Sequence, residues 1–425
     1  TVSKDINLFN HVNRLVKICL LVIDFHLHYY LISNLEVFMS EKFSPIEMLD
    51  KLISFDTVSR NSNLPIIEFI KDYLHSFGVE SHLVYNSDKT KSNLYANVGP
   101  SEVGGVILSG HTDVVPIDGQ NWNSDPFKIK EINGKIYGRG TCDMKGFIAI
   151  CLALVPDMLD AKLKRPIQLA FSYDEEVGCI GAPFMIREMS KNLPKASCAI
   201  VGEPTLLKLV DGHKASIGLD TEVTGYEVHS SLLPSGVSAI MTASKLVNWI
   251  TNKTEENQNK TPRDLDKLFH PPFTTLHVGK INGGTASNIT AKKCSFTTDI
   301  RCLPLDDGEK IIEEYEKYAE MIDSQNKEIR PESNIAITRH HWVPGLKPEN
   351  DGVAESLVRK LTGDNSTGKV SYGTEAGQFQ EEGYSTVICG PGSIEQAHQA
   401  DEFLSRDQLN KGTDFIRSII NEHAN

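Results

Sequence analysis

Acidic side chains follow an apolar run of this chain at a place where they could bind a cation or transfer a proton. The stretch FSYDEEVG, residues 171–178, sets Asp174, Glu175 and Glu176 side by side at the end of IQLAFSY, which we expect to form a buried strand. Adjacent carboxylates repel one another and lose hydration on burial, and both effects make it costly to charge them. The stretch therefore predicts a metal site, an acid–base group, or both.

Other junctions between predicted strands and loops carry side chains of the same kind. His111 and Asp113 occur in ILSGHTDVVP, and Asp143 occurs in the glycine-rich GRGTCDMKG. Glu203 occurs in AIVGEPT, and His398 lies in GSIEQAHQADEF near the C-terminus. Each motif alone is common in surface turns, but in open α/β sheets binding sites form beyond the carboxyl ends of the strands. Together the motifs predict one site at one edge of one sheet.

The ligand types indicate a hydrolytic metal centre. Carboxylates and imidazoles without cysteine suit Zn, Mn or Co, and five candidate ligands exceed what one catalytic ion needs. Two ions about 3.5–4 Å apart, sharing a carboxylate and a water, would use all of them. Glu175 and Glu176 can then differ in role, since one can bind metal while the other accepts a proton from the water. A nucleotide-binding oxidoreductase is not supported, because GRGTCDMKG completes no glycine fingerprint.

The order of elements predicts an α/β domain interrupted by a smaller α+β domain. Strands and helices alternate up to about residue 212, with continuous apolar strands typical of a mostly parallel sheet. From residue 213 the strands alternate polar and apolar residues in a β-α-β-β-α order, as in a ferredoxin-like domain. We therefore expect a catalytic domain in residues 39–212 and 326–425, and a lid or dimerisation domain in residues 213–325.

Bulk properties narrow the class of protein further. The formal net charge of −13 leaves little basic surface for nucleic acid. The eight cysteines include no CxxC pair, which fits a reducing cytoplasm. Residues 15–32 are apolar but contain Lys17 and Asp24, which are costly in a membrane span, so we predict no membrane partner. Because the first Met is Met39, we interpret residues 1–38 as an extension upstream of the fold.

Five motifs resemble, in order and spacing, those of the dinuclear zinc metallohydrolase family: HTDVVP, GRGTCDMKG, DEEVG, GEPT and AHQADE. This family contains acetylornithine deacetylase, succinyl-diaminopimelate desuccinylase, aminoacylases and carboxypeptidase G. The resemblance covers residues 39–425 and implies a metallopeptidase-like fold with a mixed central sheet and two divalent ions, Zn or alternatively Co or Mn. It implies the following site: His111 and Glu203 on one ion, Glu176 and His398 on the other, Asp143 between them, Glu175 as general acid/base, and Asp113 accepting the second ring N–H of His111.

The same resemblance assigns residues in the smaller domain. TGYEVHSSLLPSG suggests that His229 reaches across a homodimer to stabilise the oxyanion. ASNIT and DIRCLP suggest Asn288 and Arg301 as contacts of the substrate carboxylate, which arginine can bind with two hydrogen bonds. The chain departs from the family pattern at Ala215 after GHK and at Ala400 in AHQADE. Neither departure removes a functional group.

Two stretches favour the acetylornithine deacetylase subgroup. Thr141 and Cys142 precede the aspartate of GRGTCDMKG, and YGTEAGQF contains Glu375, which we expect to accept the cationic amine of the substrate. The predicted function is hydrolysis of N2-acetyl-L-ornithine to L-ornithine and acetate, in arginine biosynthesis, by a water shared between the ions. The alternatives are a succinyl-diaminopimelate desuccinylase and a broader N-acyl-amino-acid amidohydrolase. A non-catalytic homologue is disfavoured, because the base and all five ligands are present.

Overall fold

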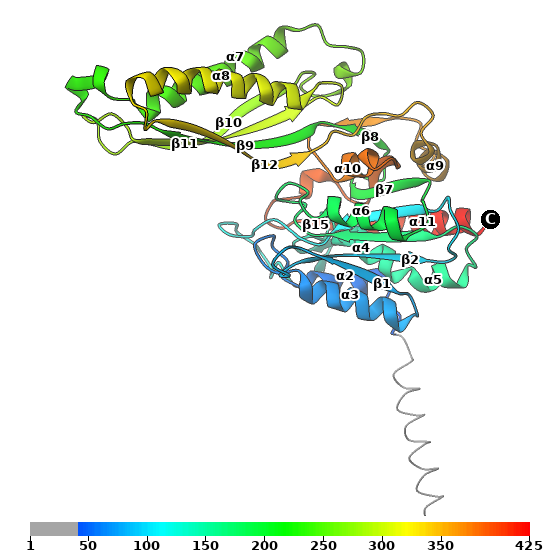
Figure 1. Cartoon of the computed structure of the whole chain (residues 1–425). Helices are drawn as coiled ribbons and strands as arrows, with labels where there is room; N and C mark the ends of the chain where they lie inside the picture. The colour runs from blue at the N-terminus through cyan, green and yellow to red at the C-terminus, as the bar shows by residue number, and fades with distance from the viewer. Residues whose placement is uncertain (1–40) are drawn as a thin grey trace, which may run out of the picture.

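The computed structural model describes residues 41–425, so the predictions made for residues 1–38 lie outside the described residues. Figure 1 shows a large α/β domain and a small domain that projects from it. The chain enters the small domain near residue 214 and leaves it near residue 344. In the part of the chain that the structure describes, no helix is long and apolar enough to cross a membrane.

An eight-stranded mixed sheet forms the centre of the large domain, in the order β1-β2-β6-β3-β7-β14-β8-β13. Strands β6, β3, β7 and β14 run parallel, whereas β2 is antiparallel to both of its neighbours. The strands are β1 (Ser81–Tyr85), β2 (Ser92–Val98), β3 (Val106–His111), β6 (Ile167–Ser172), β7 (Cys198–Pro204), β8 (Val210–His213), β13 (Gly368–Val370) and β14 (Ser385–Gly390). A separate sheet consists of β4 (Lys130–Ile132), β5 (Lys135–Tyr137) and β15 (Phe403–Ser405).

Helices cover both faces of this sheet. On β3, Val106 and Leu108 pack in one core cluster with α2, α3, α4 and α11, whereas Ile107 packs in a second cluster with α6 and α10. Both faces are therefore buried, which is the physical reason for the continuous apolar strands. The helices of this domain are α2 (Pro45–Ile53), α3 (Leu64–Ser76), α4 (Lys145–Ala153), α5 (Val155–Asp160), α6 (Ala182–Asn192), α9 (Val353–Thr362), α10 (Ala376–Glu381), α11 (Arg406–Ala424) and the short η3 (Ile394–Gln396).

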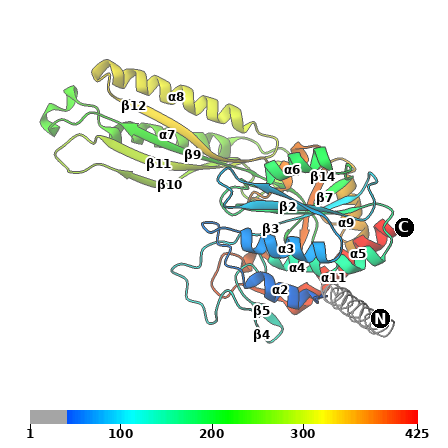
Figure 2. The same cartoon turned by 60° about the horizontal axis from the view of Figure 1, so that its bottom comes forward.

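The small domain has the predicted ferredoxin-like character. Its four strands form an antiparallel sheet in the order β10-β11-β9-β12, and α7 and α8 pack on one face. Figure 2 shows the domain extending away from the large one, with only one end of its sheet beside it. Its elements are β9 (Ala215–Thr224), η1 (Ser230–Ser235), α7 (Ala239–Asn259), η2 (Asp266–Leu268), β10 (Thr275–Gly283), β11 (Lys293–Cys302), α8 (Gly308–Ile329) and β12 (Asn334–Val343).

The second domain boundary lies later than the predicted residue 325. Strand β12 pairs with β9 along its whole length, so residues up to Val343 belong to the small domain. The strand completes a β-α-β-β-α-β order, of which the sequence predicted the first five elements. It was missed because much of it is exposed and polar, which leaves little apolar periodicity to detect.

Candidate metal centre

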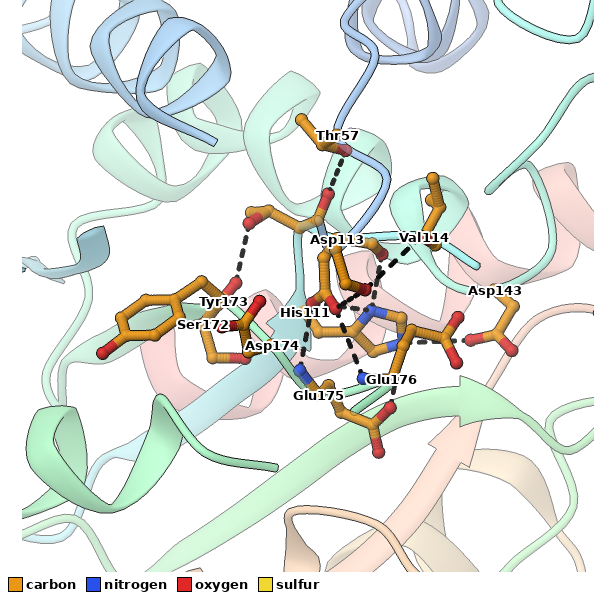
Figure 3. A network of polar contacts seen from close by, with 12 residues as sticks. Thr57, His111, Asp113, Val114, Asp143, Ser172, Tyr173, Asp174, Glu175 and Glu176 are labelled. Atoms are coloured by element: carbon orange, nitrogen blue, oxygen red, sulfur yellow. Dashed lines mark hydrogen bonds and ion pairs between the residues drawn. The ribbon is translucent and has the colours of Figure 1, made fainter. Parts of the chain in front are cut away.

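The five predicted ligands meet at one edge of the central sheet. His111 is the last residue of β3, and Glu203 lies near the end of β7. Glu176 lies in the turn after β6, Asp143 precedes α4, and His398 follows η3. Strands β6, β3 and β7 are adjacent and parallel, so their carboxyl ends bring these side chains together. Figure 3 shows His111, Asp143 and Glu176 side by side in this region.

Asp143 lies between the two histidines. Its Oδ1 is 3.0 Å from Nε2 of His111, and its Oδ2 is 3.3 Å from Nε2 of His398. The carboxylate is only 5% exposed, so few waters can hydrate it. One carboxylate therefore presents a separate oxygen to each imidazole, which is the arrangement expected of a group shared by two cations.

Three further carboxylates surround this pair of imidazoles. Glu203 Oε1 is 3.8 Å and Glu175 Oε2 is 4.0 Å from Nε2 of His111. Glu176 Oε2 is 2.9 Å from Nε2 of His398. Glu203 thus lies near His111, and Glu176 lies near His398.

His111 is oriented differently from the prediction. Its Nδ1 is 2.9 Å from the main-chain oxygen of Asp113, whereas the Asp113 carboxylate is 3.7 Å away. A carbonyl oxygen can only accept a hydrogen bond, so Nδ1 carries a proton, and loss of the Nε2 proton would leave a lone pair there for a metal ion. The Asp113 carboxylate instead accepts the main-chain N–H groups of Glu175, at 3.1 Å, and Glu176, at 3.3 Å (Figure 3). Asp113 thus links His111 to the acidic turn.

Asp174, for which the sequence suggested no role, forms an ion pair with Lys91. Both side chains are largely buried, and the ammonium also donates to the main-chain oxygen of Ser59. The Ser59 hydroxyl in turn donates to the Asp113 carboxylate at 2.7 Å. The first acid of the triplet therefore anchors the turn and leaves the two glutamates free for chemistry.

Glu402 holds the loop that carries Asp143 and was not among the residues predicted from the sequence. Its buried carboxylate accepts the main-chain N–H groups of Gly140 at 2.9 Å, Cys142 at 2.9 Å and Asp143 at 3.0 Å. It also accepts a hydrogen bond from the buried guanidinium of Arg139 at 2.8 Å. Glu402 belongs to the quoted motif AHQADE, and this acid, like Arg139 in GRGTCDMKG, was a signal that could have been used.

A cavity of about 490 Å³ lies next to this cluster, and residues of the small domain line its other side. The large domain contributes Asp143, Glu175 and Glu203 among others, and the small domain contributes Arg301 at the end of β11. Arg301 is half-exposed and pairs with Asp299 at 3.0 Å. The structure thus brings the predicted contact of a substrate carboxylate to the same cavity as the acidic cluster.

His229 and Asn288 lie together elsewhere on the small domain. Both are exposed and neither lines the cavity. Their segments are joined by a bridge between His229 and Ile289 and by the hydrogen bond from the Ser230 N–H to the Asn288 oxygen at 2.9 Å. Within this chain, then, they do not reach the acidic cluster.

Glu375 also lies outside the cavity. It is fully buried at the start of α10, where its carboxylate accepts hydrogen bonds from the hydroxyls of Ser172 and, at 3.4 Å, Ser109. These serines belong to β6 and β3, so Glu375 sits among the strands and not among the cavity-lining residues. Its predicted contact with a substrate amine is not supported by this placement.

Comparison with known proteins agrees with this geometry. The model of Peptidase family M20/M25/M40 matches residues 107–422. The acetylornithine deacetylases of Pasteurella multocida (strain Pm70) and Shigella sonnei (strain Ss046) are 33% and 34% identical to this chain. The alignments span 89% and 90% of this chain and 97% and 98% of those proteins. The chain belongs to the M20/M25/M40 family.

A solved structure supports the fold of this M20 protein. The M20 family metallo-carboxypeptidase of Sulfolobus solfataricus superimposes with a TM-score of 0.74 at 17% sequence identity. The match covers 90% of this chain and 99% of that chain. The α/β fold with a mixed central sheet and a separate antiparallel domain, predicted from the sequence, is therefore confirmed.

The donor set of the M20 protein fits divalent metal ions. His111 offers ligand atoms within 4.8 Å of those of Glu175 and Glu203 in one group, and of Asp143 and Glu176 in another. A single Nε2 atom can bind only one ion, and His398 Nε2, which is 2.9 Å from Glu176 and 3.3 Å from Asp143, can take its place in the second group. One imidazole and several carboxylates per ion are typical of hydrolytic metal sites.

The close packing of these carboxyls and imidazoles shifts their pKa values. Burial raises the pKa of Glu175 to about 8 and that of Glu176 to about 7, with repulsion from neighbouring carboxylates adding to both. Hydrogen bonds to Asp143 and Glu176 raise the pKa of His398 to about 10. Burial would raise the pKa of Asp143, but its hydrogen bonds with His111 and His398 lower it below its usual range. Bound cations would balance the negative charge of the carboxylates in place of these protons. Metal binding is therefore coupled to proton release.

We expect the metal-free protein to lose stability as the pH rises from about 5 to 8. Glu175 and Glu176 keep protons in the folded state that the unfolded chain releases near its usual pKa of 4.5, so their contribution falls as pH rises through their raised values. His398, with a raised pKa, loses its contribution above about pH 6.5, which has the same sign. Thermal unfolding from pH 5 to 8, with chelator and with Zn, measures this. If the Tm of the chelator-treated protein and that of the Zn-loaded protein changed with pH in the same way, the prediction would be contradicted.

Replacing Glu402 with glutamine should weaken metal binding without removing a ligand. The amide nitrogen replaces one carboxylate oxygen and faces either the N–H groups of Cys142 and Asp143 or the Gly140 N–H and the Arg139 guanidinium, so two hydrogen bonds that anchor the Asp143 loop are lost. Changes to residues that orient ligands typically cost about 10–100-fold in metal affinity. Competition with a metal chelator measures the loss. Glu395→Gln, in the same C-terminal loop but exposed, is the matched control and should bind metal normally.

Proposed function

We propose that this M20 protein hydrolyses the amide of N2-acetyl-L-ornithine, releasing L-ornithine and acetate with the help of two divalent ions, most simply Zn. The substrate is suggested by the relatives named acetylornithine deacetylase, which align over nearly the whole chain. The reaction class is supported by one observation above all: Asp143 lies between two imidazoles, with Glu175 within 4.0 Å of one of them.

For the division of the ligands between the ions, we propose the one that the sequence suggested. His111 and Glu203 would hold one ion, and Glu176 and His398 the other, with Asp143 shared. When bound, such ions polarise the scissile carbonyl and lower the pKa of the attacking water. Two divalent ions would also neutralise the four clustered carboxylates of Asp143, Glu175, Glu176 and Glu203, which explains how these can be buried together.

Glu175 is the residue placed to move the proton. Its carboxylate is 11% exposed, borders the cavity, and accepts a hydrogen bond from the Cys179 thiol at 3.2 Å. A carboxylate in this position can accept a proton from a water at the acidic cluster and return it to a leaving group. We infer that it takes a proton from the attacking water and returns it to the departing α-amine. Arg301, in the same cavity, would bind the α-carboxylate of the substrate.

The active form is proposed to be a homodimer. His229 and Asn288 are adjacent on the small domain but do not line the cavity of their own chain. If His229 stabilises the oxyanion, it must do so in the cavity of a second copy. A cytoplasmic location is also proposed, since all seven cysteines in residues 41–425 are free and buried, as a reducing compartment permits.

The test is release of ornithine from N-acetylornithine by Zn-loaded protein, measured against a panel of N-acyl amino acids that includes N-succinyl-diaminopimelate. We expect kcat/KM to be highest for N-acetylornithine, by about tenfold or more over uncharged side chains. A preference for N-succinyl-diaminopimelate would favour the desuccinylase alternative. Absence of turnover on the whole panel, with metal bound, would contradict the proposal.

A further inference from the structure

The small-domain sheet turns a polar, helix-free face toward the cavity. On β11, Cys294, Phe296 and Ile300 pack toward the helices, whereas the alternate residues Asp299 and Arg301 point to the opposite face. In Figure 1 the helices α7 and α8 lie on the far side of this sheet from the large domain. The residues that this face and β12 contribute to the cavity are Ser216, Arg301, His340, His341 and Val343.

Two of these residues, His340 and His341, had no role in the sequence analysis. Their rings lie 4.8 Å apart over Gly218 of the neighbouring strand β9. A Cβ atom at Gly218 would be 2.1 Å from His340 Nε2 and 2.4 Å from His341 Nδ1, closer than atoms can approach. The absence of a side chain at Gly218 therefore creates the space in which both imidazoles lie.

His341 also contacts the acidic turn of the large domain. A Cβ atom at Gly178 would be 2.6 Å from Cβ and 2.9 Å from Cγ of His341, so the imidazole lies directly against the backbone that follows Glu175 and Glu176. Its ring thus bridges the two domains at the side of the cavity. A substrate whose scissile amide lies at the acidic cluster and whose carboxylate lies at Arg301 has its side chain within the same space.

The hydrogen bonds on this face favour a ligand group that donates a hydrogen bond. His341 Nε2 is 3.0 Å from the Ser216 hydroxyl, and among residues 41–425 its Nδ1 has no hydrogen-bond partner. Burial, together with His340 and Arg301, lowers the pKa of His341 to about 4, so the ring is neutral and can accept a hydrogen bond at neutral pH. His340 Nδ1 is 3.2 Å from the Asp220 carboxylate.

The charged groups near His341 have partners of opposite charge. Arg301 is the one cation that lines the cavity from the small domain, and it is paired with Asp299. The Asp220 carboxylate lies behind His340. The Nδ1 atom of the neutral His341 ring can accept a hydrogen bond from an ammonium at the end of a flexible side chain, whereas a carboxylate has no hydrogen to donate to it.

We propose that His341, with His340 beside it and Gly218 beneath both, forms the subsite for the substrate side chain and selects N-acyl amino acids whose side chain ends in an ammonium group. This inference rests on the proposed function, since it assigns the residue that recognises the δ-amine of acetylornithine. It takes over the role predicted for Glu375, which lies outside the cavity.

The test compares two substrates of equal length, N-acetyl-L-ornithine and N-acetyl-L-norleucine, in which a methyl group replaces the ammonium. In the native protein we expect kcat/KM to favour acetylornithine. In His341→Phe, which keeps a ring but removes its nitrogens, that ratio should fall about tenfold or more through a higher KM for acetylornithine. Turnover of acetylnorleucine should stay within about threefold, which also shows that the variant is folded.

Two further variants test whether the change in selectivity comes from the imidazole of His341 or from a general effect of substitution. Gly218→Ala keeps both histidines but displaces them, and it should lower the ratio as His341→Phe does. His277→Phe is the matched control, because His277 is an exposed histidine on strand β10 that does not line the cavity, and its ratio should be native.

The outcomes distinguish the subsite from the proposed function. A native preference for acetylornithine that survives in His341→Phe overturns the subsite alone. Equal losses on both substrates also overturn it, because they indicate a structural role. A native protein that hydrolyses both substrates equally well overturns the subsite while keeping the amidohydrolase, and one that hydrolyses neither overturns both.

Discussion

Replacing Glu175 with glutamine is expected to lower kcat by about 10²–10⁴-fold while two metal ions remain bound. The amide keeps the size of the side chain and can still accept the Cys179 thiol hydrogen bond, but it cannot take a proton from water. The substitution does not change the five residues assigned to the ions, which are His111, Asp143, Glu176, Glu203 and His398. The expected signature is therefore a loss of kcat with little change in KM, since substrate binding through Arg301 is unaffected.

The measurement combines steady-state kinetics with metal content determined by mass spectrometry. Asp174→Asn is the matched control, because it removes a neighbouring carboxylate that faces Lys91 and not the cavity. It should keep kcat within about tenfold, apart from some loss of stability from breaking a largely buried ion pair. Near-native kcat in Glu175→Gln would refute the assignment. Loss of an ion in that variant would instead make Glu175 a ligand, as its position 4.0 Å from His111 allows.

The clustering of the candidate ligands could be predicted from the sequence because the placement of most of them is local. His111, Glu176 and Glu203 each lie at or just after the end of a continuous apolar strand, and parallel strands bring their ends together whatever the rest of the fold does. Asp143 and His398 have no such strand of their own. They were identified through the order of the five motifs, which the family match supports.

The residues that orient the ligands could not be predicted in this way. Glu402 reaches Asp143 across 259 positions of the chain, and Lys91 reaches Asp174 across 83. Nothing in the local pattern around either residue indicates its partner, because the contact depends on how loops from distant strands pack. The placement of His341 over Gly218 similarly depends on the register of β12 against β9, and β12 itself was not recognised.

Glu375 shows how a motif can be detected and its role still be misjudged. The stretch YGTEAGQF is distinctive, but the sequence does not reveal whether its acid faces solvent or the core. In the structure the helix α10 begins there and directs Glu375 between β3 and β6, onto Ser109 and Ser172. Burial raises the pKa of this carboxyl to about 7, so it can be neutral where it lies. We therefore expect Glu375 to affect the site only indirectly, by holding strand β3, which ends at His111, and strand β6, which leads into the acidic turn.

Replacing Asp143 with alanine is expected to produce the largest loss of metal. Each oxygen of this carboxylate faces a different imidazole, at 3.0 Å and 3.3 Å, so its removal takes a ligand from both ions at once. In the proposed centre the remaining carboxylates, Glu203 and Glu176, would each bind one ion only. We expect fewer than two ions per chain after dialysis, and a fall in kcat/KM of at least about 10³-fold, since a bound ion stabilises transition-state charge by several kcal/mol.

Metal titration by calorimetry, together with Tm measured with and without Zn, tests this expectation. Native protein should bind two ions and gain Tm, because ligands that bind only the folded state stabilise it. Asp143→Ala should bind fewer ions and gain less, whereas Glu402→Gln should keep the stoichiometry and lose affinity. This contrast follows from the geometry: Asp143 faces both imidazoles itself, while Glu402 touches only the main chain of the loop that holds it. Two ions bound at native affinity in Asp143→Ala would show that the carboxylate is not shared.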